Sequence, residues 1–170
     1  MKVFLREFTV ADVQAAIDGD YLAHDARVAH LGRVSTVLPT TIGIDSVFYE
    51  TQSSTGDNIY WKQIFNFKDL INFTDSRGSA EGAFEDYLKE GDVELLCTCP
   101  AFLYWGYKYI TSQLDLNVGP PENRAPTIRN PDQRGIICKH IDLAMREMAS
   151  VDMKLISKTM EEKIKKHLGM

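Results

Sequence analysis

Cysteine is scarce in this sequence, with three residues among 170. Three thiols cannot all pair within one chain, and the opening residues, Met1 to Glu7, are too few and too charged for a secretory signal. No apolar run approaches the roughly 18 residues that a membrane-spanning helix needs. We therefore expect a protein of a reducing compartment that has neither disulfides nor a membrane partner.

Positive charge is also in short supply. The chain has 19 Lys and Arg residues against 24 Asp and Glu residues, for a formal net charge of −5. Proteins that wrap duplex DNA usually have the opposite balance, because contacts with phosphate dominate their affinity. Hydrophobic residues make up 44% and charged residues 25% of the chain, which excludes wholesale disorder and a coiled-coil rod. Length and composition together predict a single soluble globular domain.

Recognisable catalytic motifs are missing as well. The sequence contains neither a Gly-rich phosphate-binding loop nor a Gly-Xaa-Ser-Xaa-Gly nucleophile elbow. Its acidic residues are scattered, as on any acidic surface. We therefore expect that the protein is not an enzyme.

The spacing of apolar residues predicts an α+β fold. Alternation predicts strands, dense turn residues separate the two strands of a hairpin, and apolar side chains three and four apart predict helices. The expected elements are helices at 10–18 and 20–31, a hairpin at 46–67 with its turn at 53–58, a loop at 75–79, a helix at 80–90, a strand at 93–97, a helix at 101–114, an irregular loop at 115–135, and helices from 139 and at 151–168.

The cysteines are concentrated in two tight pairs. Cys97 and Cys99 are separated by one residue, and Cys138 is separated by one residue from His140. Three thiolates and one imidazole form the Cys3His set of structural zinc sites, and soft sulfur ligands argue against magnesium, calcium or manganese. Pro100 helps the first pair to turn, because it blocks further strand pairing. The pattern therefore predicts one structural Zn²⁺ bound by these four side chains.

Three other interpretations of these residues remain open. The cysteines can be three buried free thiols, since cysteine is among the most buried residue types. Cys97 and Cys99 can form a redox pair, which leaves the pair at Cys138 and His140 without a purpose. A catalytic zinc is disfavoured, because four protein ligands leave no position for water. If zinc is bound, the second ring nitrogen of His140 should donate to a carbonyl or carboxylate, with Glu94 and Asp142 as candidates.

The two pairs, with the hairpin before them, resemble the SWIM-type zinc finger. The resemblance implies a β-hairpin that leads into a zinc knuckle, followed by a helix. The 38 residues between Cys99 and Cys138 form a longer gap than in most members of that family. The matching stretches are Cys97-Thr98-Cys99-Pro100-Ala101-Phe102 and Cys138-Lys139-His140-Ile141.

This resemblance organises the whole chain as one domain with three parts. The sheet of the zinc module is expected to be small and antiparallel, with helices flanking it at both ends of the chain. The parts are a helical N-terminal part at 1–44, a SWIM-like zinc module at 45–148 with insertions at about 71–91 and 100–137, and a C-terminal helix at 149–170.

The second insertion is similar to small SWIM-like proteins of tailed bacteriophages. That resemblance implies a structural or assembly protein of the virion, in its head, neck or tail, made in the cytoplasm of the host cell. Its partners would be other virion proteins or copies of itself. The stretches that carry the resemblance are Tyr104-Trp105-Gly106-Tyr107, Pro120-Pro121-Glu122-Asn123 and Ile128-Arg129-Asn130-Pro131.

The alternative is a SWIM-type module that binds nucleic acid or a protein partner. Arginines of the long loop favour nucleic acid, but neighbouring acidic residues partly offset them. Aromatic residues are enriched at the centres of protein interfaces, so the aromatic segment of the insertion favours protein contacts. The candidate partner-binding residues are Tyr104, Trp105, Tyr107, Tyr109, Arg124, Arg129 and Arg134.

Overall fold

A computed structural model describes residues 37–53, 58–133 and 135–170 of the chain. The helices predicted at 10–18 and 20–31 lie outside the described residues, and so does Arg134. None of the helices within the described ranges is long and apolar enough to cross a membrane.

Four antiparallel strands form one sheet in the order β1-β2-β3-β4. Three of them confirm the predicted hairpin and the strand that follows it. The α+β fold class is therefore confirmed. The strands are β1 (Val37–Ile42), β2 (Ser46–Gln52), β3 (Tyr60–Phe67) and β4 (Val93–Cys97).

The first strand lies within 1–44, which was predicted as a helical N-terminal part, and corrects that prediction at Val37–Ile42. Val37–Ile42 pairs with β2, and its register shifts between Pro39 and Thr41. Proline has no N–H to donate, so within sheets it occurs at edges and irregularities. The proline argues against a strand at this position, although the β-branched residues around it favour one. The strand was therefore not predicted.

One face of the sheet is buried and contributes to the core. In β2, Val47, Tyr49 and Thr51 are fully buried, and they alternate with half-buried residues. In β4, Leu95 and Cys97 follow the same rule. Because side chains alternate between the faces of a sheet, Cys97 at the end of β4 points into this core.

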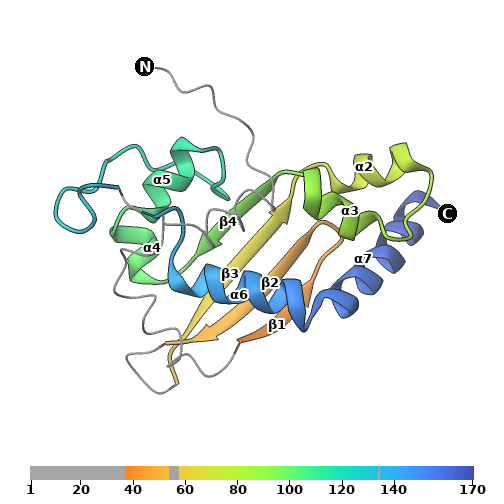
Figure 1. Ribbon diagram of the computed structural model, residues 1–170, viewed down its shortest axis with the longest axis horizontal. Helices are drawn as coiled ribbons and strands as arrows, with labels where there is room; N and C mark the ends of the chain where they lie inside the picture. Colours follow the sequence, from red (N-terminus) through yellow and green to blue (C-terminus); the bar gives the residue numbers. More distant parts are fainter. Residues whose placement is uncertain (1–36, 54–57, 134) are drawn as a thin grey trace.

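Two helices cover the core face of the sheet (Figure 1). α6 (Lys139–Ser150) lies across the strands, and α7 (Met153–Leu168) continues beyond it toward the C-terminus. Both were predicted from i, i+4 spacing. Their apolar stripes are buried: Ile141, Ala144, Met145 and Met148 in α6, and Ile156, Met160 and Ile164 in α7.

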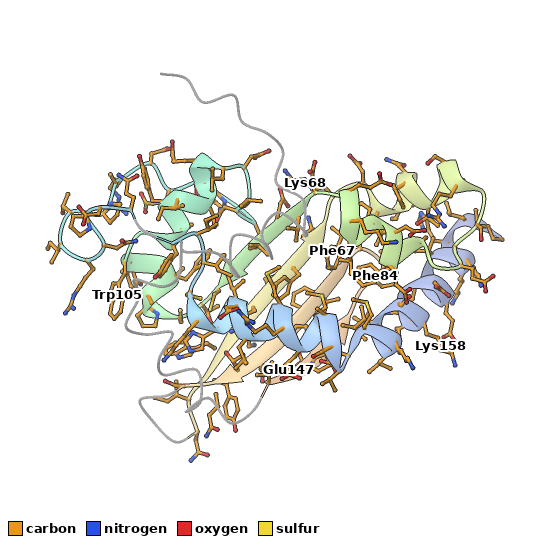
Figure 2. The ribbon with its side chains drawn as sticks, viewed as in Figure 1. Phe67, Lys68, Phe84, Trp105, Glu147 and Lys158 are labelled. Atoms are coloured by element: carbon orange, nitrogen blue, oxygen red, sulfur yellow. The ribbon has the colours of Figure 1, made fainter. Side chains whose placement is uncertain are left out.

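The first insertion forms two short helices, α2 (Leu70–Arg77) and α3 (Ala83–Glu90). The loop predicted at 75–79 is wrong for its first three residues, because α2 continues to Arg77 and ends at Gly78, whose φ is 66°. The predicted helix at 80–90 begins three residues late, at Ala83. Phe84 of α3 packs edge-on against Phe67 at 4.9 Å between ring centroids (Figure 2).

The second insertion begins with two helices where one was predicted. α4 (Pro100–Tyr104) and α5 (Tyr107–Gln113) are separated by Trp105 and Gly106. Gly106 has a φ of +99°, which residues with a Cβ rarely adopt, and this backbone turn interrupts the expected helix at 101–114. The segment from 115 to 133 contains no regular helix or strand, as predicted for that part of the loop.

The start of the long loop adds a short parallel bridge beside β4. The Leu95 N–H donates to the carbonyl of Leu116 at 2.6 Å, and the Val118 N–H donates to the carbonyl of Leu95 at 3.1 Å. The loop therefore covers part of the outer edge of the sheet before it leaves toward the solvent.

Candidate metal centre

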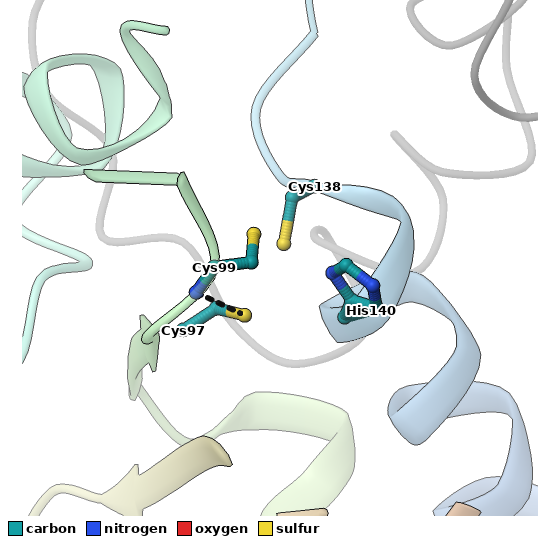
Figure 3. Close-up of side chains that lie close together, drawn as sticks. All are labelled: Cys97, Cys99, Cys138 and His140. Atoms are coloured by element: carbon teal, nitrogen blue, oxygen red, sulfur yellow. Dashed lines mark hydrogen bonds between the residues drawn. The ribbon is translucent and has the colours of Figure 1, made fainter. Parts of the chain in front are cut away.

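Two chain turns bring the four predicted ligands together. Cys97 is the last residue of β4, and Cys99 is the N-cap of α4. Cys138 is the N-cap of α6, and His140 lies in the first turn of that helix. Figure 3 shows the three sulfur atoms and the imidazole ring converging from these two segments. All four residues are buried.

The turn between Cys97 and Cys99 is held to the neighbouring strand by its middle residue. The Thr98 N–H donates to the carbonyl of Lys62 at 2.9 Å, and the Lys62 N–H donates to Thr98 Oγ1 at 2.9 Å. This reciprocal pair continues the ladder between β3 and β4 for one more residue. Thr98 thereby lets Cys97 and Cys99 project toward the same point.

The ligand atoms form a compact set. The three Sγ atoms and one imidazole nitrogen all lie within 4.8 Å of one another. A tetrahedral zinc site with Zn–S bonds of about 2.3 Å has edges of about 3.8 Å. Shifts of well under 1 Å per side chain would therefore complete a tetrahedron around a metal ion.

The imidazole of His140 provides an independent indication of a ligand. The residue is 4% exposed, and neither Nδ1 nor Nε2 has a hydrogen-bond partner among the described residues. Buried polar groups are almost always paired, because leaving one unpaired costs roughly 1–3 kcal/mol. A cation among the sulfur atoms would satisfy one of these nitrogens.

The expected carboxylate partners of His140 are engaged elsewhere. Glu94 accepts a hydrogen bond from Asn66 at 2.8 Å, and Asp142 accepts one from Arg146 at 2.7 Å. Neither prediction is supported, since the described residues form no hydrogen bond with either ring nitrogen.

Several N–H groups point at the sulfur atoms. The Cys99 N–H donates to Cys97 Sγ at 3.5 Å (dashed in Figure 3), and the Phe102 N–H donates to Cys99 Sγ at 3.3 Å. The side-chain amide of Gln63 also donates to Cys97 Sγ, at 3.5 Å. Such donors stabilise sulfur in its charged form. Gln63 was missed by sequence reasoning, because no local pattern connects it with Cys97, 34 residues away.

The three thiols differ in their proton affinity. Burial raises the pKa of Cys97 and also raises the pKa of Cys138. Hydrogen bonds from Cys138 and Cys97 lower the pKa of Cys99. Hydrogen bonds therefore favour the charged form of the sulfur at Cys99, and burial disfavours it at Cys97 and Cys138. Binding a divalent cation would release protons from the thiols.

The candidate partner-binding residues that the structure describes lie in two different environments. Tyr107 is 1% exposed and belongs to the core, so the structure does not support it as a contact residue. Trp105, Tyr109, Arg124 and Arg129 line one surface cavity together with Tyr104, which is 76% exposed.

Comparisons with protein-family models, with curated proteins and with solved structures find no match to this chain. The fold and the buried cluster thus define an α+β protein with a candidate Cys3His metal centre.

Proposed function

We propose that this chain is a structural protein, held together by one Zn²⁺, that acts through protein–protein contacts in the virion of a tailed bacteriophage. The zinc has no catalytic role in this proposal, because four protein ligands close its coordination sphere. The choice of metal rests on three sulfur donors and one imidazole, which suit zinc better than cations that prefer oxygen.

The observation that carries the proposal is the position of the ligands relative to the second insertion. Cys99 caps the helix that begins this insertion, and Cys138 caps the helix that follows it. A metal ion would therefore join the two ends of a segment with little regular structure. In such sites the free energy of metal binding is also folding free energy.

The insertion that the metal would close also presents aromatic side chains at the surface. Tyr104 and Trp105 follow Cys99 by five and six residues, and they lie beside a cavity that the long loop completes. A zinc ion with this placement serves to hold a contact surface in one shape.

The virion setting rests on the resemblance of the insertion to small SWIM-like phage proteins. The net charge of −5 supports protein contacts over non-specific binding of nucleic acid. Nucleic-acid binding is the second candidate function, and it is favoured by the guanidinium of Arg129, which lies over the ring of Trp105 at 5.3 Å, an arrangement that also suits unpaired bases.

Two measurements test this proposal. Metal analysis of the purified chain should find one zinc per molecule, and mass spectrometry of purified phage particles should find the protein retained after washing at high salt. Absence from the particles, together with DNA binding that weakens steeply as salt rises, would support the second candidate instead.

A further inference from the structure

A cavity of about 400 Å³ lies between the two halves of the second insertion. One wall is formed by residues 103–106 and Tyr109 of the α4–α5 segment, and the other by Glu122 and residues 124–129 of the long loop. Figure 2 shows Trp105 at the end of the molecule opposite to α7. A volume of this size is in the range of pockets that enclose a small ligand or a few side chains.

The two walls are fitted to each other at one close contact. A Cβ added to Gly106 would lie 2.5 Å from Cγ of Pro126, so the proline ring rests directly on the glycine backbone. Gly106 is buried, and Pro126 is half-buried. The cavity is therefore bounded by two segments in close contact.

Two large apolar side chains at the rim of the cavity are unusually exposed. Ile128 is 87% exposed and Tyr104 is 76% exposed, the two highest values among the large hydrophobic residues that the structure describes. Both line the same cavity. Exposed apolar residues gathered at one place, rather than scattered singly, mark sites of interaction.

The cavity also presents one cation without an acidic partner. Arg124 is paired with Glu122 through two parallel N–H···O bonds of 3.0 Å, and this contact lowers the pKa of Glu122 to about 2. Arg129 has no carboxylate within ion-pair distance among the residues described, and its guanidinium lies over Trp105. Its N–H donors therefore remain available to an anion beside an aromatic surface.

These features favour one kind of occupant. A small inorganic anion would leave Tyr104 and Ile128 uncovered, and a purely apolar segment would leave Arg129 unpaired. Arginine and carboxylate groups match in geometry and form strong charge-assisted hydrogen bonds. An apolar side chain next to a carboxylate satisfies both requirements, and peptides commonly carry the two in adjacent residues.

We propose that this cavity binds a segment of a partner protein that presents an apolar side chain next to an Asp or Glu, with the apolar group between Tyr104 and Ile128 and the carboxylate on Arg129. This inference deepens the proposed function, since it names the kind of partner that the zinc-closed insertion would contact.

The test is an NMR titration of the full-length, zinc-loaded chain. The probes are the capped tetrapeptides acetyl-Gly-Leu-Asp-Gly-amide and acetyl-Gly-Leu-Asn-Gly-amide, which differ in charge and hardly in shape. The Asp peptide should shift the indole N–H of Trp105 and the backbone N–H of Gly106 in a saturable way. The Asn peptide should bind about tenfold more weakly, because it forms a neutral hydrogen bond in place of a charge-assisted one.

Two charge-reversal variants provide the matched comparison. Arg129→Glu should abolish the preference for the Asp peptide. Lys158→Glu makes the same change on an exposed face of α7, far from the cavity (Figure 2), and should leave the preference intact. Ile128→Ala removes apolar surface from the rim of the cavity and should weaken the binding of both peptides equally.

Three results would overturn the inference: no saturable shift at Trp105, equal affinity for the two peptides, or a preference that survives in Arg129→Glu. Saturation of the same resonances by oligothymidylate, weakening steeply with salt, would assign the cavity to single-stranded nucleic acid instead. The proposed function fails separately, through a chain that purifies without zinc or phage particles that lack the protein.

Discussion

Gln63 and Cys97 face each other across β3 and β4, and the side-chain amide of Gln63 donates to the Cys97 sulfur at 3.5 Å. The same nitrogen contacts Thr51 Oγ1 at 2.9 Å and the carbonyl of Trp61 at 2.6 Å. Gln63 is fully buried. The candidate metal centre is thus connected to the sheet through a side chain as well as through the backbone.

Replacing Gln63 with Leu should weaken zinc binding by about 10-fold to 100-fold, the usual effect of losing a group that contacts a metal ligand. The affinity is measured by competition with a chromophoric chelator. Thr51→Val is the matched control, because it removes another hydrogen bond of the same amide and leaves the sulfur contact in place. Equal losses of affinity in the two variants would show that Gln63 acts only on the stability of the sheet.

Removing zinc should destabilise the fold. Binding free energies of structural zinc are on the order of 10 kcal/mol in small zinc-binding peptides, so a strong chelator should lower the melting temperature markedly. The purified chain should contain one zinc, and Cys99→Ser and Cys138→Ser should each abolish stoichiometric binding. A chain that is metal-free and equally stable would contradict the prediction, and so would a disulfide between Cys97 and Cys99.

Replacing His140 with Ala should lower both zinc affinity and stability, because this imidazole is buried and has no hydrogen-bond partner among the described residues. His167 lies in the last turn of α7 and is exposed, so His167→Ala provides the control. His24→Ala and His30→Ala should also have little effect. Thermal unfolding and metal content report both properties, and similar losses in all four variants would count against His140 as a ligand.

Replacing Gly106 with Ala should destabilise the second insertion, because an added Cβ would meet the ring of Pro126 at 2.5 Å, on a backbone with φ +99°. Gly119→Ala separates the two causes, since Gly119 has φ +87° and no atom within 4 Å of an added Cβ. Backbone strain alone should cost roughly 1–2 kcal/mol, and the Gly106 variant should lose more. Denaturant unfolding measures the stability of both variants. Equal losses would mean that the loop around Pro126 moves aside for the added Cβ without a cost in stability.

The pH dependence of stability should change above pH 10. Burial, and next the charge of Asp152, raise the pKa of Tyr49 above its ordinary value of 10.0; its hydroxyl donates to Asp152 Oδ2 at 3.0 Å. The folded state therefore holds this proton more tightly than the unfolded state. The stabilisation is complete below pH 10 and is lost as the pH rises through the raised value.

Tyr49→Phe should accordingly reduce the loss of stability at alkaline pH. The check is the free energy of unfolding from denaturant titrations between pH 8 and about 11, where the unfolded-state tyrosine ionises. Tyr87, whose pKa burial also raises, provides a second alkaline transition in both proteins. An unchanged pH profile in Tyr49→Phe would mean that Tyr49 ionises equally in both states.

Features with a local cause were predicted well from the sequence. The strand Val93–Cys97 and the helix after Cys138 follow from alternation and from helical spacing, and they place the four ligands on two turns. The cysteine pairs are themselves local signals, since each places two donors one residue apart. Whether the cluster holds zinc stays a prediction.

Features that depend on contacts distant in sequence were missed. The strand at Val37–Ile42 exists through its pairing with β2, while its proline argues locally against a strand. At the break, the backbone of Gly106 lies against Pro126, 20 residues later. Gln63 meets Cys97 only because β3 and β4 pair in one particular register. The local pattern of a single sequence does not show which distant residues will pair or pack together.

The short bridge between Leu95 and the start of the long loop has a consequence for how copies of the chain can meet. The carbonyl of Leu116 and the N–H of Val118 occupy the hydrogen-bonding groups of Leu95 in β4, which an incoming strand would need. At the opposite edge of the sheet, Pro39 and the irregular register of β1 interrupt strand pairing. Backbone pairing between the sheets of two molecules is thus hindered at both edges. Subunits would therefore meet through their side chains.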